Sequence, residues 1–328
     1  MSMEKFRWGF IGAGMIAKKA LYPAISKSNT GEIYAVASRD ADKAMTISPK
    51  GLIYTDYDEL LADPNVEGVY ISLPNAFHLP LAIRAMKAGK HVLCEKPLGM
   101  NAAEVREAMV VSKETGKVLI EASWNRWHPR TKRIQEIVQS GKLGKLTRIR
   151  TAFTYDGLDQ SNIRLDPTIG GGILYDLGPY STVAPLWLTG FPKVTDMEVQ
   201  TVWHPGGVDE TTRVNYKVGG VPAETVTSAN IPMSLWMIVE GTKGSVRTGG
   251  SDSFVSLNNP STLEIEIQGK KKVERFDACD PYQLMADAFV RHVRGKKDWV
   301  MPLEESLRFA ELFDEAFALM GKPNGKGN

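Results

Sequence analysis

The first third of the chain alternates between two patterns of apolar and polar positions. Short apolar runs alternate with longer segments in which apolar residues recur at helical spacing. The runs predict strands at 8–11, 33–38, 66–73, 91–94 and 118–121, and the longer segments predict helices at 76–88 and 102–115, which Gly89 and Gly116 end. Strands that alternate with helices indicate right-handed crossovers, so this part predicts a doubly wound parallel sheet.

The pattern changes after residue 122. It predicts a helix at 130–140, a strand at 146–154, a loop at 155–172, a helical segment at 173–188 and a closing helix at 304–320, before a disordered tail at 323–328. Residues 195–276 mostly follow period two, as between Arg213 and Val218, where polar and apolar residues alternate. This period predicts an antiparallel sheet.

Together these patterns predict two domains. Residues 1–122 form an α/β domain with the parallel sheet, and residues 123–328 form an α+β domain with a large, open, mostly antiparallel sheet. Helices on one face of that sheet leave the other face exposed, and exposed apolar positions favour a partner. We therefore expect a homodimer or homotetramer paired through this sheet.

Composition and charge narrow the functional classes. The 328 residues are 43% hydrophobic and 24% charged, and the net charge of +2 comes from Lys and Arg spread along the chain, which does not favour a nucleic-acid partner. Cys94 and Cys279 are too few for a disulfide framework or a thiolate metal site, and the histidines lack metal-ligand spacing, so no metal is expected. No run approaches the ~20 apolar residues of a membrane helix, and no signal peptide is evident. We expect a cytoplasmic protein without a membrane partner.

A glycine-rich turn follows the first predicted strand. Gly12, Gly14 and Ala17 form the pattern Gly-x-Gly-x-x-Ala, with Met15 and Ile16 between the last two. Gly12 permits a tight turn, Gly14 lets a pyrophosphate approach the backbone, and Ala17 keeps the helix close to the strand. In a strand-turn-helix unit, this pattern predicts a Rossmann dinucleotide site.

The end of the second predicted strand distinguishes between the two nicotinamide cofactors. NAD enzymes usually carry an acid there, whereas this strand ends at Ser38 and Arg39. A serine and a guanidinium suit a 2'-phosphate, which favours NADP(H). Asp40 follows directly and leaves NAD(H) possible, since its carboxylate could accept ribose hydroxyls; it could instead cap the next helix.

Three further stretches carry candidate chemistry. Leu73, Pro74, Asn75 and His78 follow the fourth predicted strand, and Glu95 and Lys96 follow the fifth, at the carboxyl ends where doubly wound sheets bind ligands. Later in the chain, a triple glycine at 170–172 precedes Asp176 and Tyr180, which share one face if the segment is helical.

With these motifs the chain resembles the Gfo/Idh/MocA family. The resemblance rests on residues 12–17, 74–78, 89–97 and 170–180, and it extends over nearly the whole chain. It implies a Rossmann domain followed by an open-faced α/β domain, and NAD(P)-dependent oxidation or reduction of sugars, cyclitols or related alcohols. Many relatives have histidine at the position of Tyr180. A tyrosine there makes the chain similar to the branch that contains glucose-fructose oxidoreductase, dihydrodiol dehydrogenase, xylose dehydrogenase and ketosugar reductases.

The resemblance also implies residue roles. Lys96 would lie beside the nicotinamide and the reacting oxygen, and Asp176 would bind substrate hydroxyls or orient the proton-transfer group. The phenol of Tyr180 is a poor base at neutral pH unless a cation lowers its pKa, which Lys96 could do. We therefore expect Tyr180 to exchange the proton. The rival is that Lys96 transfers the proton and Tyr180 only positions the substrate.

Substrate contacts are also expected from Arg164 and Trp124, with a surface ion pair and core packing as the respective alternatives. His78 is either a cofactor contact or a helix-start residue without chemistry. Two other functions stay open: a glycosidase that oxidises its substrate transiently at bound NAD, and a non-catalytic dinucleotide sensor.

Two features depart from the usual family pattern. The stretch between Asp40 and Tyr54 is short, so the second helix is expected to be truncated. Gly178 and Pro179 lie inside the predicted helix, and because proline lacks the backbone N–H that a helix needs, a kink is expected just before Tyr180.

Overall fold

The computed structural model describes residues 4–248 and 259–321, which form two compact units. The first unit is Met1–Trp124 with Asp280–Leu307, and the second is Asn125–Cys279 with Arg308–Asn328. The sequence predicted the domain boundary after residue 122, and the first segment of the first unit ends slightly later, at Trp124. The segment Asp280–Leu307, which the sequence assigned to the second domain, packs with the first unit.

The first unit contains a six-stranded parallel sheet in the order β3-β2-β1-β4-β5-β6. Its strands are β1 (Phe6–Ile11), β2 (Gly31–Ala37), β3 (Ile53–Tyr54), β4 (Gly68–Ile71), β5 (His91–Cys94) and β6 (Leu119–Glu121). The doubly wound parallel sheet predicted from the sequence is confirmed. The two-residue strand β3 was not predicted.

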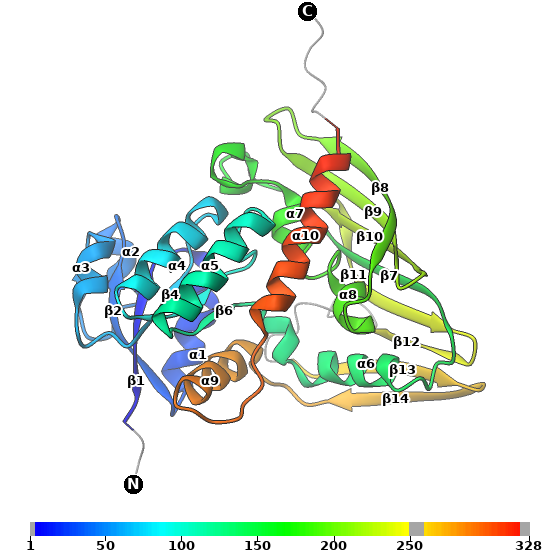
Figure 1. Ribbon diagram of the computed structural model, residues 1–328, viewed down its shortest axis with the longest axis horizontal. Coiled ribbons are helices and arrows are strands. Elements are labelled where there is room, and N and C mark those ends of the chain that lie inside the picture. Colours follow the sequence, from blue (N-terminus) through cyan, green and yellow to red (C-terminus); the bar gives the residue numbers. More distant parts are fainter. Residues whose placement is uncertain (1–3, 249–258, 322–328) are drawn as a thin grey trace, which may run out of the picture. The chain divides into compact units, whose positions relative to one another are not determined.

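Helices and short helical turns connect these strands. They are η1 (Ala17–Leu21), α1 (Tyr22–Lys27), α2 (Ala41–Met45), α3 (Tyr57–Ala62), η2 (Asn75–Phe77), α4 (His78–Lys87), α5 (Ala102–Thr115) and η3 (Trp124–Trp127). Helix α5 has the predicted bounds: the Asn101 side chain accepts the Glu104 N–H at its start, and Gly116 ends it with φ of 64°. Helix α4 lies against α5, as Figure 1 shows. The expected truncation of the second helix is confirmed, since α2 has five residues.

Aromatic packing holds the late segment on the first unit. Trp8, on β1, is fully buried, and its ring centroid lies 4.8 Å from that of Phe6 and 4.9 Å from that of Phe289. Phe289 belongs to α9 (Pro281–Val293), which also contacts α1. Burial of these large rings explains why the segment returns to the first unit.

Among its described residues, the second unit is built on an eight-stranded sheet in the order β14-β13-β12-β11-β7-β10-β9-β8. Its strands are β7 (Leu146–Asp156), β8 (Val194–Trp203), β9 (Asp209–Val218), β10 (Val221–Ser228), β11 (Asn230–Gly241), β12 (Gly244–Thr248), β13 (Ser261–Ile267) and β14 (Lys270–Phe276). Strands β7 and β10 are parallel and the other pairs are antiparallel. The mostly antiparallel sheet is therefore confirmed.

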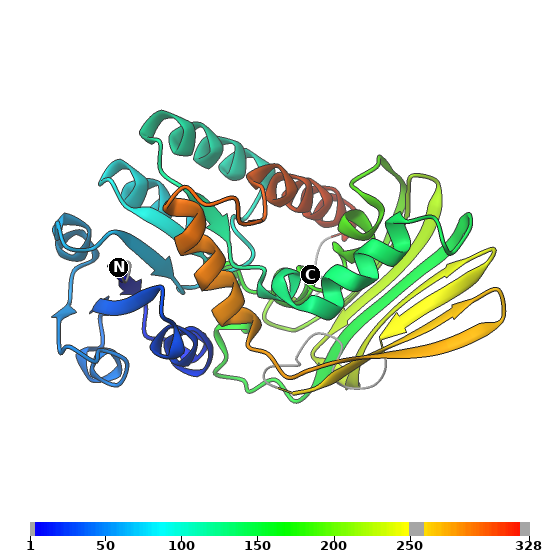
Figure 2. The ribbon, with the colours of Figure 1, turned by 90° about the horizontal axis from the view of Figure 1, so that it is seen from below.

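Helices cover one face of this sheet. Helix α6 (Pro129–Gln139) packs on β12 and β13, α7 (Ile173–Leu177) on β9 and β10, and α8 (Ala184–Thr189) on β7 and β9. Figure 2 shows α6 running along the sheet. On β9, Val214 and Tyr216 are buried while Arg213 and Lys217 are exposed, as their alternation predicts.

The remaining elements are η4 (Ile163–Leu165), η5 (Pro167–Ile169) and α10 (Leu303–Leu319), which confirms the predicted closing helix. The predicted tail at 323–328 lies outside the described residues. No helix of the described residues is long and apolar enough to cross a membrane.

Candidate active site

The loops that follow four strands of the first unit start side by side. The N–H of Gly12 donates to Ala37 O (2.9 Å), that of Ser72 to Ile11 O (3.0 Å), that of Glu95 to Ile71 O (2.9 Å) and that of Ala122 to Cys94 O (2.7 Å). These bonds place the predicted cofactor residues of the first unit along one edge of the sheet, at the carboxyl ends of its strands.

The glycine-rich turn fits a dinucleotide. Gly12 has φ of 93°, and a Cβ there would lie 2.8 Å from Ser72 O, so the turn against the neighbouring loop requires glycine. Gly14 is exposed, as is the Met15 side chain, while Ile16 is half-buried and Ala17 fully buried. The helix begins at Met15, and Lys18 N–H donates to Gly14 O at 3.1 Å. An exposed glycine at a helix N-terminus is a geometry that accepts a pyrophosphate.

The end of β2 presents a serine and an arginine. Ser38 is buried, and its hydroxyl accepts the Asp40 N–H at 3.1 Å, while Arg39 is exposed. Asp40 caps α2 by accepting the Lys43 N–H at 3.0 Å, and it pairs with the Lys43 ammonium at 2.9 Å. The carboxylate of Asp40 is thus used locally, which was the second of its two predicted roles.

His78 is buried and lies between two loops. Its Nδ1 is 2.7 Å from Pro97 O and its Nε2 is 2.8 Å from Leu73 O, so the ring connects the loop after β4 with the loop after β5. Burial lowers the pKa of His78, because the charged ring would lose its hydration. Pro74 and Asn75 of the loop after β4 are half-buried. The geometry favours a bracing role for His78 over direct contact with a cofactor.

The loop after β5 carries Glu95 and Lys96. Glu95 is buried and accepts the Tyr70 hydroxyl at 2.6 Å, while Lys96 is half-buried. Burial raises the pKa of Tyr70 well above its usual value, and the Glu95 charge raises it further, so Tyr70 stays a donor. These contacts hold the backbone from which Lys96 projects.

In the second unit, each residue of the triple glycine has its own reason to be glycine. Gly170 has φ of 81°. A Cβ on Gly171 would lie 2.5 Å from Asp166 O, because the Gly171 and Gly172 N–H groups donate to Asp166 O (2.9 Å) and Arg164 O (2.8 Å). Gly172 has φ of 113° and lies against Asp209. The turn is thus folded onto the preceding loop.

Asp209, the first residue of β9, holds the start of α7 and was missed by the sequence analysis. Its Oδ2 accepts the Leu174 N–H at 2.8 Å and the Thr212 hydroxyl at 3.0 Å. The side chain is buried, which raises its pKa to about 6, while its hydrogen-bond donors lower it. A single aspartate at a strand start gives no local signal for this contact.

The buried carboxyl of Asp209 predicts a pH dependence of stability. Its pKa is above the usual 3.8 only in the folded state, so the stabilisation it provides is complete below about pH 4 and is lost as pH rises through about 6. The Asn amide oxygen can accept the same two donors without ionising. We expect the free energy of unfolding of the wild type, relative to Asp209→Asn, to fall by about 1–2 kcal/mol from about pH 5 to about pH 8. Denaturant unfolding at both pH values measures this, and parallel profiles would contradict it.

Arg164 and Asp176 form a two-pronged ion pair. Arg164 Nε lies 2.6 Å from Asp176 Oδ2, and Arg164 Nη2 lies 3.1 Å from Asp176 Oδ1. Burial lowers the pKa of Arg164, but the charge of Asp176 outweighs this effect and raises it; Tyr155 and Tyr180 also face the guanidinium. Tyr180 is 7% exposed, with its ring 5.4 Å from that of Phe153. The structure thus brings Arg164, Asp176 and Tyr180 together.

The helix that carries Asp176 does not reach Tyr180. Helix α7 ends at Leu177, and residues 178–183 form turns before α8. The Tyr180 N–H donates to Leu177 O at 3.0 Å, a turn bond rather than an α-helical one. The expectation of one helix at 173–188 with a kink before Tyr180 is therefore wrong, because the helix ends before Gly178 and Pro179 and a second helix begins only at Ala184.

The candidate Trp124 and two neighbouring basic residues lie in packed surroundings. Trp124 is 5% exposed and stacks on Tyr282 with a centroid distance of 5.2 Å, which favours core packing. His128 caps α6 by accepting the Arg130 N–H at 3.1 Å, and burial lowers its pKa to about 4. Arg126 lies 4.7 Å from the Trp187 ring centroid.

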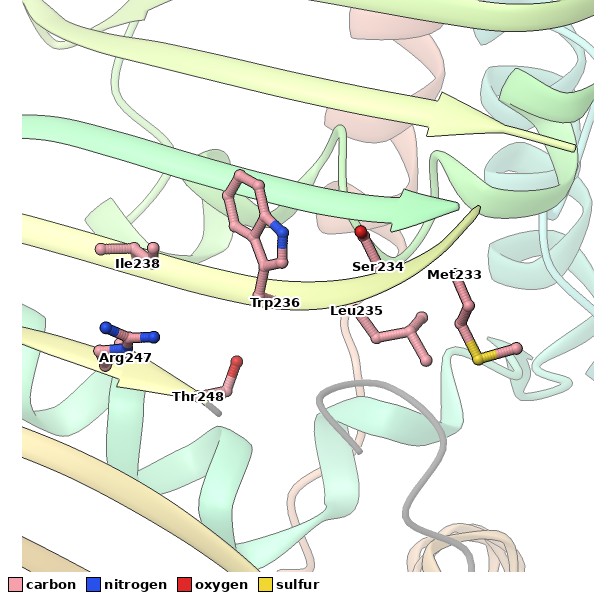
Figure 3. Close-up of a pocket in the computed structure, with 7 residues that line it drawn as sticks. All are labelled: Met233, Ser234, Leu235, Trp236, Ile238, Arg247 and Thr248. Carbon is pink, nitrogen blue, oxygen red and sulfur yellow. The ribbon is translucent and has the colours of Figure 1, made fainter. Parts of the chain in front are cut away.

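A pocket of about 400 Å³ lies elsewhere in the second unit, on β11 and β12. Figure 3 shows Trp236 and Ile238 on β11 and Arg247 on β12 among its lining side chains, none of which is a predicted site residue. Within the described part of the chain, no group of three or more His, Cys, Asp or Glu side chains could hold a metal ion.

Comparison with known proteins gives matches over most of the chain. Residues 6–123 match the model of the GFO/IDH/MocA oxidoreductase family with an NAD-binding Rossmann fold, and residues 131–247 match the model of the GFO/IDH/MocA C-terminal domain. The chain is 33% identical over 333 residues to trans-1,2-dihydrobenzene-1,2-diol dehydrogenase of Mus musculus, covering 96% of this chain and 97% of the relative. It is 32% identical over 320 residues to D-xylose 1-dehydrogenase (NADP(+)) 2 of Haloferax volcanii, covering 94% and 96%.

Solved structures are similar over almost the full length. A 3-ketoreductase from Actinomadura kijaniata, in complex with NADP and TDP-benzene, superimposes with a TM-score of 0.86 at 25% identity, covering 97% of this chain and 98% of that one. Structures of the same ketoreductase also exist with one lysine replaced by alanine and with one tyrosine replaced by phenylalanine.

Proposed function

The chain belongs to the GFO/IDH/MocA family of NAD(P)-binding oxidoreductases, and from this premise we propose that it transfers hydride between nicotinamide C4 of NADP(H) and a carbon of a sugar or similar polyhydroxylated ring. The observation that carries the proposal is the edge of the parallel sheet, where the Gly12 turn, the end of β2 and the loop with Lys96 start side by side. This edge can hold a dinucleotide with an ammonium beside its reactive end.

We propose that Tyr180 exchanges the proton and that Lys96 supplies the cation that favours its phenolate. Hydride transfer at an alcohol carbon requires one proton to leave or join the oxygen. A positioned cation favours the phenolate, and Arg164 of the same unit adds a second positive charge that faces Tyr180. Asp176 holds Arg164 and supplies carboxylate oxygens for substrate hydroxyls. In the ketoreductase of Actinomadura kijaniata, the replaced lysine and tyrosine are separated by the same number of residues as Lys96 and Tyr180, which supports this pairing.

The experiment that tests the function is a screen of sugars, cyclitols and vicinal diols with NADP and with NAD, following absorbance of the reduced nicotinamide. We expect turnover with at least one polyhydroxylated ring, and faster turnover with NADP. The absence of turnover with every alcohol, and with ketosugars in the reverse direction, would contradict the proposal.

Cofactor preference is assigned to Ser38 and Arg39. Arg39 is exposed at the sheet edge, and Asp40 is already engaged in capping α2. A charge-assisted hydrogen bond is worth about 1.5–3 kcal/mol, so Arg39→Ala is expected to weaken NADP binding about 10- to 100-fold and to change NAD binding little. Calorimetric titration measures both. The matched control is Lys43→Ala, which removes a nearby cation paired with Asp40. If Arg39→Ala lost the same amount of affinity for NADP and for NAD, the assignment would be contradicted.

The homo-oligomer is assigned to the face of the eight-stranded sheet opposite its helices. Ser234, Trp236 and Ile238 point to that face, since they alternate with buried residues of β11. The sheet also carries ion pairs between neighbouring strands, such as that of Arg148 on β7 with Glu224 on β10. This mixture of an aromatic anchor and paired charges suits a second copy of the chain.

Trp236→Glu is expected to raise the dissociation constant of the oligomer about 30-fold or more, because it buries a charge in place of an aromatic anchor. Sedimentation equilibrium measures the change. Val110→Glu, on an exposed position of α5, is the control and should leave assembly intact. An unchanged oligomer in Trp236→Glu would contradict the assignment to this face.

The cytoplasmic location that the sequence led us to expect stays a prediction.

A further inference from the structure

Glu121 is a buried carboxyl with no role in the proposed chemistry. It is the last residue of β6 and pairs in register with Cys94, the last residue of β5. Its side chain is 2% exposed. Carboxylates are almost never fully buried unless they are paired, so this position calls for a partner.

The loop after β5 lies over this carboxyl. The Ala122 N–H donates to Cys94 O at 2.7 Å, which fixes the end of β6 beside the start of that loop. The Leu98 backbone faces Glu121 and lowers its pKa. Ser306, at the start of α10, lies near this carboxyl, but its buried hydroxyl has no hydrogen-bond partner in the described residues. Because Leu98 lies two residues beyond Lys96, the loop that carries Lys96 is anchored on Glu121.

Charge balance links Glu121 with Lys96. Burial is the main effect that raises the pKa of Glu121, and Glu95 adds to it while the Lys96 ammonium opposes it, which leaves the pKa at about 7. The titratable and polar groups that face this cluster are Cys94 and Glu95 from β5 and its loop, Tyr70 from β4, His78 from α4, Tyr282 from α9 and Ser306 from α10. The pKa of buried His78 is lowered, whereas the Lys96 ammonium is a cation that faces the Glu121 carboxyl.

Glu95 already has donors of its own. It accepts the Tyr70 hydroxyl at 2.6 Å and the Lys96 N–H at 3.4 Å. Glu121 lies one strand further along the sheet edge, on the opposite side of β5 from Tyr70. The two carboxyls therefore approach the lysine loop from neighbouring strands.

We propose that Glu121 is a positioning residue that acts as the counter-ion of Lys96, keeping its ammonium charged and its loop in place. The inference rests on the proposed function of Lys96 as the cation beside the reacting oxygen. A lysine that must stabilise a phenolate has to stay charged at the pH of turnover, and a buried carboxylate supplies the field that keeps it so.

The test measures the protonation of Lys96 without substrate or cofactor. The rate at which an amine-reactive reagent labels Lys96 is followed by peptide mass spectrometry against pH, because only the neutral amine reacts. Glu121→Gln keeps the shape of the side chain and one hydrogen-bonding oxygen but removes the charge. In this variant we expect Lys96 to be labelled about tenfold faster at neutral pH, which corresponds to moving its labelling profile about one pH unit lower. Lys90 is the internal control: its Nζ donates to Asp63 O (2.6 Å) and Val66 O (2.8 Å), and its labelling should not change.

Ser306→Ala is the matched control near the same cluster, because it removes a buried hydroxyl that has no hydrogen-bond partner in the described residues and leaves the Glu121 carboxyl in place. Lys96 should therefore be labelled at the wild-type rate in Ser306→Ala. Equal labelling of Lys96 in the wild type and in Glu121→Gln, or the same increase in both variants, would overturn the proposal. Because labelling needs no turnover, that failure is distinguishable from failure of the proposed function, which the substrate screen decides.

Discussion

The single-turnover rate of hydride transfer is expected to fall about 10²- to 10⁴-fold in Tyr180→Phe, because a positioned acid/base group contributes that much. Lys96→Met should cause a comparable loss and should also move the pH profile to higher pH, since the phenol would lose the cation that lowers its pKa. Stopped-flow absorbance of the nicotinamide against pH measures both effects.

Two controls match these changes. Tyr175→Phe removes a hydroxyl from α7, where the ring packs on Phe317 at a centroid distance of 4.5 Å, and Lys87→Met removes an exposed ammonium from α4. Both should turn over at nearly the wild-type rate. A Tyr180→Phe enzyme with near-normal hydride transfer would exclude Tyr180 as the proton-transfer group and favour Lys96 in that role.

Gly172→Ala is expected to destabilise the second unit by roughly 2–5 kcal/mol and to reduce kcat/KM at least about tenfold. Backbone in this φ region costs a side chain about 1–3 kcal/mol, and the added Cβ would also meet Asp209. Asp209 cannot withdraw cheaply, because it holds the Leu174 N–H at 2.8 Å. The strain therefore reaches the segment that carries Asp176 and Tyr180.

Gly207→Ala separates the cost of backbone strain from the cost of contact with Asp209. Gly207 has φ of 88°, but a Cβ there would meet nothing within 4 Å, so the variant reports backbone strain alone. We expect a loss of about 1–2 kcal/mol in thermal unfolding and an unchanged kcat/KM. If Gly172→Ala were as stable and as active as Gly207→Ala, Asp209 would not restrain the turn.

Patterns that are local in sequence predicted their elements well. Helix α5 has its cap Asn101 and its stop Gly116 directly beside it, so its bounds follow from sequence. The alternation on β9 is equally local, because one face of the sheet is covered and the other is not. The same holds for the Gly12 turn, whose conformation the glycine itself permits.

Contacts between distant residues could not be predicted in this way. Asp209 meets Leu174 across 35 positions, and Phe289 returns to Trp8 on the first strand. The paired Arg164 and Asp176 were each named as candidates, but their mutual ion pair depends on how the loop folds back on the triple glycine. A disturbance of the helix at Pro179 was predicted from the chemistry of proline itself, but a kink was expected and the helix instead ends at Leu177.

Net hydride transfer between a nicotinamide and a polyhydroxylated substrate is the reaction that we propose for this chain. Mass spectrometry of the product formed from a ketosugar and NADPH with both C4 hydrogens replaced by deuterium tests it. We expect one deuterium on the carbon of the new alcohol and stoichiometric consumption of NADPH. Binding of NADPH without label transfer would indicate a sensor, and release of free sugar from a glycoside without net change in the nicotinamide would indicate a glycosidase; either result would exclude the proposed reaction.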